Sequence, residues 1–192
     1  MISGMKRRTL VIGAAGLAAM LTSGWLAWRE SSRRSPQANR AVRQQRSTEP
    51  DAGPFFAARL PDLDGHEQAL SQWRGKPLVL NFWATWCAPC VKEMPDLSRL
   101  AGQYPKAQFV GVAIDTAQNV REFALKVPVS YPIVIAGHQG IELVRAFGNT
   151  AGGLPCTVLL RSDGSIQEVI MGAIDPAKLS EQIRQLLASS AV

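Results

Sequence analysis

Cysteine and histidine are scarce in this sequence. Its 192 residues include three cysteines, Cys87, Cys90 and Cys156, and two histidines. Small proteins that depend on disulfides for stability carry many more cysteines, so a disulfide scaffold is excluded. Neither histidine stands at a finger-like spacing from the cysteines, so a zinc finger is not predicted and no resident metal or cofactor is expected.

A net positive charge is also absent outside the N-terminal quarter. Residues 1–50 hold nine Lys or Arg and two Asp or Glu, whereas residues 51–192 hold twelve and thirteen. A nucleic-acid-binding domain needs a basic face, so no nucleic-acid partner is expected. A basic segment beside an apolar run favours a membrane surface instead.

The apolar run covers residues 10–28, which contain no charged side chain. A helix of this length just crosses a hydrocarbon core of about 30 Å. Trp25 and Trp28 stand at its far end, where aromatic rings favour the interface. We predict a basic leader and transmembrane anchor over residues 1–28. A cleaved signal peptide shares this pattern and stays open, although no clear cleavage site follows Trp28.

Residues 29–53 are rich in Ser, Arg, Gln and Pro, which predicts a flexible basic linker. Its six arginines, counted alone, would keep the following domain in the cytoplasm. The predicted folded domain spans residues 54–192. There, strand patterns at 55–63, 68–70, 78–83, 109–114, 131–135, 157–160 and 167–171 alternate with helical patterns at 88–101, 119–126, 141–147 and 177–188. This alternation predicts a three-layer α/β domain.

The chemistry centres on Trp86-Cys87-Ala88-Pro89-Cys90. The first cysteine follows a predicted strand and the pair opens a predicted helix. A helix N-terminus stabilises negative charge, so Cys87 is expected to be the attacking thiolate and Cys90 the resolving thiol. Pro89 suits the first helical turn, where its missing N–H has no partner to lose.

The surrounding sequence resembles the thioredoxin superfamily. The run from Asn81 to Pro95, the lead-in at 61–65 and 70–76, and Gly153-Leu154-Pro155 before a strand carry the resemblance, most closely to its membrane-tethered TlpA/ResA-like branch. It covers about residues 54–187. It implies a thioredoxin fold, in which a central mixed β-sheet is flanked by helices and an N-terminal helix spans the membrane, and it implies that Pro95 kinks its helix.

The resemblance also assigns roles around the dithiol. It implies a cis peptide bond before Pro155 and an exposed backbone edge at Leu154, where a peptide could pair as an added strand. Trp86, Ala88 and Pro89 would support the site. Glu93 matches an acidic residue near the cysteines of the branch and could move protons, but a solvated helix glutamate is equally compatible with the pattern. Asn81 replaces the buried aspartate of general thioredoxins, which favours Glu93 as the proton partner.

Cys156 directly follows Pro155, and the fold would put it near Cys87. It could be a third redox thiol, part of a Cu(I) site with Cys87 and Cys90, or a small buried residue, and the last is favoured because free cysteine commonly packs as a small hydrophobe.

The sequence therefore predicts a thiol:disulfide oxidoreductase, an enzyme that reduces disulfides of extracytoplasmic proteins. The resemblance to the TlpA/ResA-like branch, which includes the cytochrome c maturation thioredoxins, implies that apocytochrome c could be among its substrates. Its partners would be protein thiols and disulfides, a membrane or periplasmic thiol donor, and the membrane through residues 10–28. From the resemblance, we expect a single-pass inner-membrane protein with its C-terminal domain in the periplasm, against the arginine count. A copper-delivery module is the alternative. A thiol peroxidase is disfavoured because Leu80 and Ala84 replace its usual proline and threonine.

Overall fold

The computed structural model describes residues 50–189. The chain divides into two compact units, Met1–Thr48 and Glu49–Val192, and the described residues belong to the second. The predicted leader, anchor and most of the linker therefore lie outside the described residues. Within residues 50–189, none of the helices combines the length and the apolar character needed to cross a membrane.

A five-stranded mixed sheet forms the centre of the fold. Its order is β5 (Ile133–Ile135), β4 (Gln108–Ala113), β3 (Leu78–Trp83), β6 (Cys156–Leu160) and β7 (Ile166–Met171). Strands β3, β4 and β5 are parallel, while β6 runs antiparallel to both β3 and β7. The predicted mixed sheet is confirmed.

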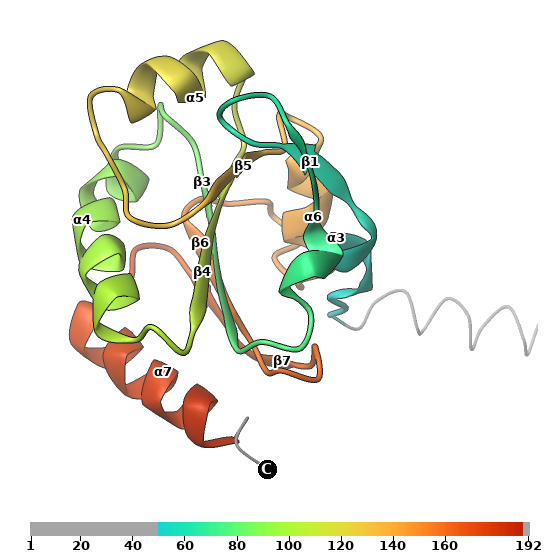
Figure 1. The fold of residues 1–192 in the computed structure, drawn as a ribbon, viewed down its shortest axis with the longest axis vertical. Helices are drawn as coiled ribbons and strands as arrows, with labels where there is room; N and C mark the ends of the chain where they lie inside the picture. The colour runs from blue at the N-terminus through green and yellow to red at the C-terminus, as the bar shows by residue number, and fades with distance from the viewer. Residues whose placement is uncertain (1–49, 190–192) are drawn as a thin grey trace, which may run out of the picture. The chain divides into compact units, whose positions relative to one another are not determined.

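Helices cover both faces of this sheet, so the predicted three-layer arrangement is also confirmed. In Figure 1, α4 (Ala88–Gln103) and α7 (Pro176–Ser189) lie along one side, while α3 (Gly53–Ala57) and α6 (Gly140–Ala146) lie along the other. Helix α5 (Ala117–Ala124) lies across the end of the sheet where β3 leads into α4.

The predicted strand over residues 55–63 is partly wrong. Its first residues belong to helix α3, and only β1 (Arg59–Pro61) is extended, paired antiparallel with β2 (Glu67–Ala69). Pro54 in the first turn favours the helix, and the Phe55 ring packs 6.4 Å from the Trp73 ring in the short 3₁₀ helix η1 (Leu70–Trp73). Tertiary packing of the aromatic rings thus outweighs the local strand preference.

Strand β3 carries the site because its side chains alternate between the two layers. All six of its residues are buried. Leu78, Leu80 and Phe82 belong to the core cluster on the α3 and α6 side. Val79, Asn81 and Trp83 face the other layer, which α4 and α7 cover.

Candidate active site

The dithiol stands at the start of helix α4, where the structure holds Cys87 and Cys90 as a disulfide with their Cα atoms 5.3 Å apart. Cys87 is the N-cap residue, and Pro89 lies in the first turn as predicted. Cys87 keeps 6% of its surface exposed, while Cys90 has none. A substrate disulfide can therefore approach Cys87 and not Cys90, which supports the predicted division of roles.

Exposed side chains surround Cys87. Trp86 leaves 66% of its surface in contact with solvent, and Ala88 and Pro89 are exposed as well. Trp86 is therefore exposed directly before Cys87 in the chain, and its role in supporting the site stays a prediction.

Glu93 lies beneath the dithiol and is not a solvated helix residue. It is 5% exposed and stands one helical turn beyond Cys90, a spacing that makes the two side chains neighbours. Its Oε1 accepts a hydrogen bond from Asn81 Nδ2 at 2.8 Å, and its Oε2 accepts one from the backbone N–H of Ile174 at 3.0 Å. Burial raises the pKa of the Glu93 carboxyl despite these two bonds.

Asn81 links Glu93 to the neighbouring strand. Its Nδ2 also donates to Thr157 Oγ1 at 3.2 Å, so one amide holds both partners. Asn81 occupies the position where the resemblance leads one to expect a buried aspartate, and the carboxyl comes from helix α4 instead. The structure therefore brings Asn81 and Glu93 together, a contact that the sequence did not predict, while the role of Glu93 stays a prediction.

The loop before Cys87 is fixed by Asp115, a residue that the sequence analysis missed. Asp115 is buried at the end of β4, where its Oδ2 accepts hydrogen bonds from both the backbone N–H and the hydroxyl of Thr85. Its Oδ1 accepts from Thr116 N at 2.7 Å and Asn119 Nδ2 at 2.8 Å. Burial pushes the pKa of Asp115 upward, but the hydrogen bonds outweigh it and hold the pKa below its ordinary value. Nothing in the local sequence pattern distinguishes this aspartate from a loop residue.

The Leu154–Pro155 peptide bond is cis, which confirms that prediction. Pro155 is buried, and its carbonyl accepts a hydrogen bond from Gly172 N at 2.9 Å. Leu154 is half-buried and packs against the cluster that contains Cys87 and Cys90. The structure thus packs Leu154 against the cluster that includes the dithiol, and its role in binding a peptide stays a prediction.

Cys156 does not face the dithiol, which corrects the expectation that the fold would bring it near Cys87. It pairs with Phe82, is fully buried and packs in the cluster on the α3 and α6 side. Its neighbour Thr157 points to the α4 side instead, toward Asn81. Burial raises the pKa of the Cys156 thiol, which disfavours the reactive thiolate. These observations fit the interpretation of Cys156 as a small core residue.

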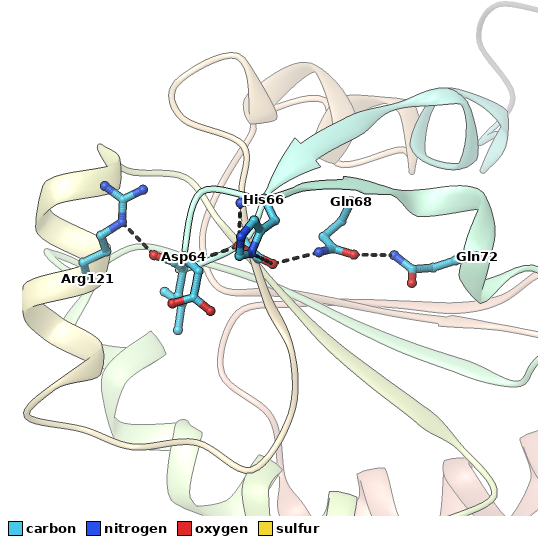
Figure 2. Close-up of polar contacts among 7 residues, drawn as sticks. Asp64, His66, Gln68, Gln72 and Arg121 are labelled. Atoms are coloured by element: carbon cyan, nitrogen blue, oxygen red, sulfur yellow. Dashed lines mark hydrogen bonds and ion pairs between the residues drawn. The ribbon is translucent and has the colours of Figure 1, made fainter.

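Among the described residues, the only group of three metal-ligating side chains is Asp62, Asp64 and His66 in the turn between β1 and β2. The three cysteines therefore do not form the thiol cluster that the copper alternative requires. Asp62 already accepts from the backbone N–H groups of Asp64 and His66 and from Gln68 Nε2. Figure 2 shows this chain of contacts, which Gln72 extends through Gln68.

The same turn is tied to helix α5 near the site. Arg121 Nε donates to the Leu63 carbonyl at 2.7 Å, as Figure 2 shows. His66 and His138 are both exposed, as predicted. Hydrogen bonds within the turn therefore explain why Asp62, Asp64 and His66 lie close together.

Comparison with known proteins identifies the family. Residues 52–169 match the AhpC/TSA family. The chain belongs to the AhpC/TSA family. It is 36% identical over 133 residues to thiol-disulfide oxidoreductase ResA of Geobacillus thermodenitrificans, which covers 68% of this chain and 72% of that protein. A ResA protein of Halalkalibacterium halodurans is 33% identical over 125 residues, or 64% of this chain and 69% of the relative.

Solved structures support the same assignment for this AhpC/TSA chain. The structure of MTB dsbF has a TM-score of 0.61 at 30% identity and covers 68% of this chain and 96% of its own. A secreted Mycobacterium tuberculosis disulfide oxidoreductase, described as homologous to E. coli DsbE, has a TM-score of 0.59 at 26% identity, with 70% and 99% covered. The predicted thioredoxin-like fold and the predicted enzyme class, a thiol-disulfide oxidoreductase, are confirmed.

Proposed function

We propose that this enzyme reduces disulfides of extracytoplasmic proteins through Cys87 and Cys90. The observation that carries this proposal is the difference in exposure between the two sulfurs: Cys87 reaches solvent, whereas Cys90 is fully buried and stands one helical turn before the buried Glu93. An attacking thiol must meet its substrate, while a resolving thiol needs only its partner sulfur and a proton acceptor.

The reaction transfers two electrons from the dithiol to the substrate. The Cys87 thiolate attacks a substrate disulfide, which forms a mixed disulfide and releases one substrate thiolate. Glu93 then takes the proton of Cys90, and the Cys90 thiolate attacks the Cys87 sulfur. The Cys87–Cys90 disulfide closes, and the second substrate sulfur leaves as a thiolate. A membrane or periplasmic thiol donor returns the enzyme to the dithiol form.

We place the enzyme on the outer side of the cytoplasmic membrane, anchored through residues 10–28. The apolar run and the basic residues on both sides of it support an anchor. The relative from M. tuberculosis is described as secreted, which supports an extracytoplasmic domain. A topology reporter fused after Val192 should be active only outside the cytoplasm, and activity confined to the cytoplasm would contradict this placement.

The substrates would be oxidised cysteine pairs in exported proteins, including apocytochrome c. Support comes from the resemblance to the TlpA/ResA-like branch and from the exposed Trp86 beside Cys87. Leu154 packs against the cluster that contains the two cysteines, and we propose that its backbone pairs with an extended peptide.

A trapping experiment tests this function. Cys90→Ala should hold substrates on Cys87 as mixed disulfides, because the resolving thiol is gone. The trapped proteins are identified after non-reducing electrophoresis and mass spectrometry. Cys90→Ala combined with Cys156→Ala should trap the same set, since Cys156 is buried on the other face. If Cys87→Ala captures partners and Cys90→Ala captures none, the two roles are reversed.

A further inference from the structure

The strand register aligns one residue from each of β3, β4 and β5 in a row across the sheet, beneath helix α4. Asn81 on β3 pairs with Gly111 on β4, and Gly111 pairs with Ile133 on β5. Tyr131 lies two residues before Ile133, so both side chains point to the same face of the sheet. Because Asn81 binds Glu93 from this face, the Glu93 carboxyl also lies at this row.

Gly111 has no side chain, so the space above it in this row is filled by the neighbouring rings. A Cβ atom built there would lie 3.1 Å from both Trp83 Nε1 and Tyr131 Cε2, tighter than ordinary van der Waals contact. The missing side chain therefore lets the Tyr131 ring approach the strand that carries Asn81. The Tyr131 ring also packs in the cluster that contains Leu97, which lies one turn beyond Glu93 on α4.

Three polar atoms on the residues around Gly111 are buried without a partner among the described residues. They are the Tyr131 hydroxyl, Trp83 Nε1 and Asn81 Oδ1. Tyr131 is only 7% exposed, so water does not freely replace the missing hydrogen bond. Burial, and then the negative charge of nearby Glu93, raises the pKa of Tyr131, so its phenol keeps its proton at any physiological pH.

We propose that Tyr131 is a positioning residue of the dithiol site, whose neutral phenol stabilises the Glu93 carboxylate when that carboxylate is needed to take the proton of Cys90. The inference rests on the proposed function. A hydroxyl dipole acts strongly in a buried, low-dielectric site. Each Glu93 oxygen accepts a single hydrogen bond, from Asn81 or Ile174, so each retains capacity for a further donor.

Tyr131 differs from most of the other groups around Glu93 because its side chain carries a buried hydroxyl without a hydrogen-bond partner. From β3 and β6 the neighbours are neutral Asn81 and Thr157, and from the segment after β7 the neighbour is a backbone N–H. The titratable groups placed toward Glu93 by helical spacing and by electrostatic interaction are Cys90 on α4 and Tyr131. No described Lys or Arg is among the buried residues, so no buried cation offsets the charge of the carboxylate, and the phenol is a further dipole beside the Asn81 amide and the Ile174 N–H.

The test uses the reduced full-length enzyme and an aromatic disulfide reagent that releases a coloured thiol. Attack by Cys87 releases the first coloured thiol, and resolution by Cys90 releases the second, so the two steps appear as separate phases. The rate of the second phase is measured against pH. Tyr131→Phe should move the midpoint of this profile upward by about half to one pH unit, since the carboxylate loses one dipole. The first phase should keep its profile.

Tyr104→Phe is the matched control because the chain has only two tyrosines. The Tyr104 hydroxyl contacts Ser180 at 2.6 Å near the far end of α4, so its removal should leave the midpoint unchanged. Tyr131→Phe removes an unpartnered hydroxyl and should fold. As a second measurement, ring-fluorinated tyrosine in the Tyr104→Phe background makes the Tyr131 phenol a stronger donor and should move the midpoint downward.

An unchanged midpoint in both folded Tyr131→Phe and the fluorinated protein would overturn this inference. The proposed function fails differently. If Glu93→Gln leaves the pH profile of the second phase as it is in wild type, Glu93 is not the proton acceptor, whatever Tyr131 does. If the wild type releases no second thiol, Cys90 is not the resolving thiol.

Discussion

Glu93 is a buried carboxyl group, and burial of such a group affects stability as well as reactivity. The pKa of Glu93 is raised in the folded protein, so the folded state binds this proton more tightly than the unfolded chain does. The stabilisation from this proton is fully present below the ordinary value near 4.5 and is lost as the pH rises through the folded pKa. A charged carboxylate in this position therefore lowers stability at neutral pH.

We predict that the free energy of unfolding of the wild-type protein increases as the pH falls from neutral toward about 4.5. Glu93→Gln should lose this part of the pH dependence, as measured by urea unfolding at a series of pH values. Glu142→Gln on the exposed side of α6 is the control and should keep the wild-type slope. The lowered pKa of Asp115 acts in a separate window, because its stabilisation is lost only as the pH falls below about 3.8.

At the scale of single residues, the sequence predicts side chains that belong to a local motif. Cys87, Cys90 and Pro155 stand in recognisable runs, and Asn81 indicates that a carboxyl must come from elsewhere. Asp115 and Tyr131 escape prediction because their partners lie on other strands or helices. The direction of Cys156 depends on strand register, which the sequence pattern does not fix.

Helix α6 depends on close packing at its first residue. A Cβ atom on Gly140 would overlap Ile114 Cδ1 and Ala136 Cβ, whereas a Cβ atom on Gly102 near the end of α4 meets nothing. Gly140→Ala should therefore lower the free energy of unfolding by about 1–3 kcal/mol. Gly102→Ala should raise it by up to about 1 kcal/mol through helix propensity. Urea unfolding of the two variants checks both, and a stabilised Gly140→Ala would contradict the packing argument.

The elements themselves differ in how well the sequence predicts them. Strand β3 follows from a short apolar run with turn signals on both sides, helix α4 follows from a clear helical spacing, and both match the structure. Strand β5 is shorter than the predicted 131–135 and begins after Pro132, because proline has no N–H to donate to a ladder. Helix α3 is too short for its periodicity to show, and the rings that Phe55 contacts outside the helix, those of Trp73 and Phe147, are distant in sequence.

At the scale of the whole molecule, all three described hydrophobic clusters are built from residue 52 onward. Just before these clusters begin, the backbone N–H of Asp51 donates a hydrogen bond to the Ala146 carbonyl at 2.8 Å. We predict that residues 49–192 fold alone and reduce a soluble protein disulfide at the rate of the full-length enzyme. Circular dichroism and an insulin reduction assay check this. Loss of the cooperative thermal transition in the shortened protein would contradict it.

The burial of Cys156 allows local opening of the oxidised enzyme to be measured by thiol labelling. With Cys87 and Cys90 joined, Cys156 is the one free thiol in the chain, and it is shielded by the sheet and by the α3 and α6 layer. A thiol-labelling reagent can reach it only when that layer opens. The labelling rate under native conditions, compared with the rate for an unfolded chain, therefore gives the opening equilibrium of the core without any denaturant.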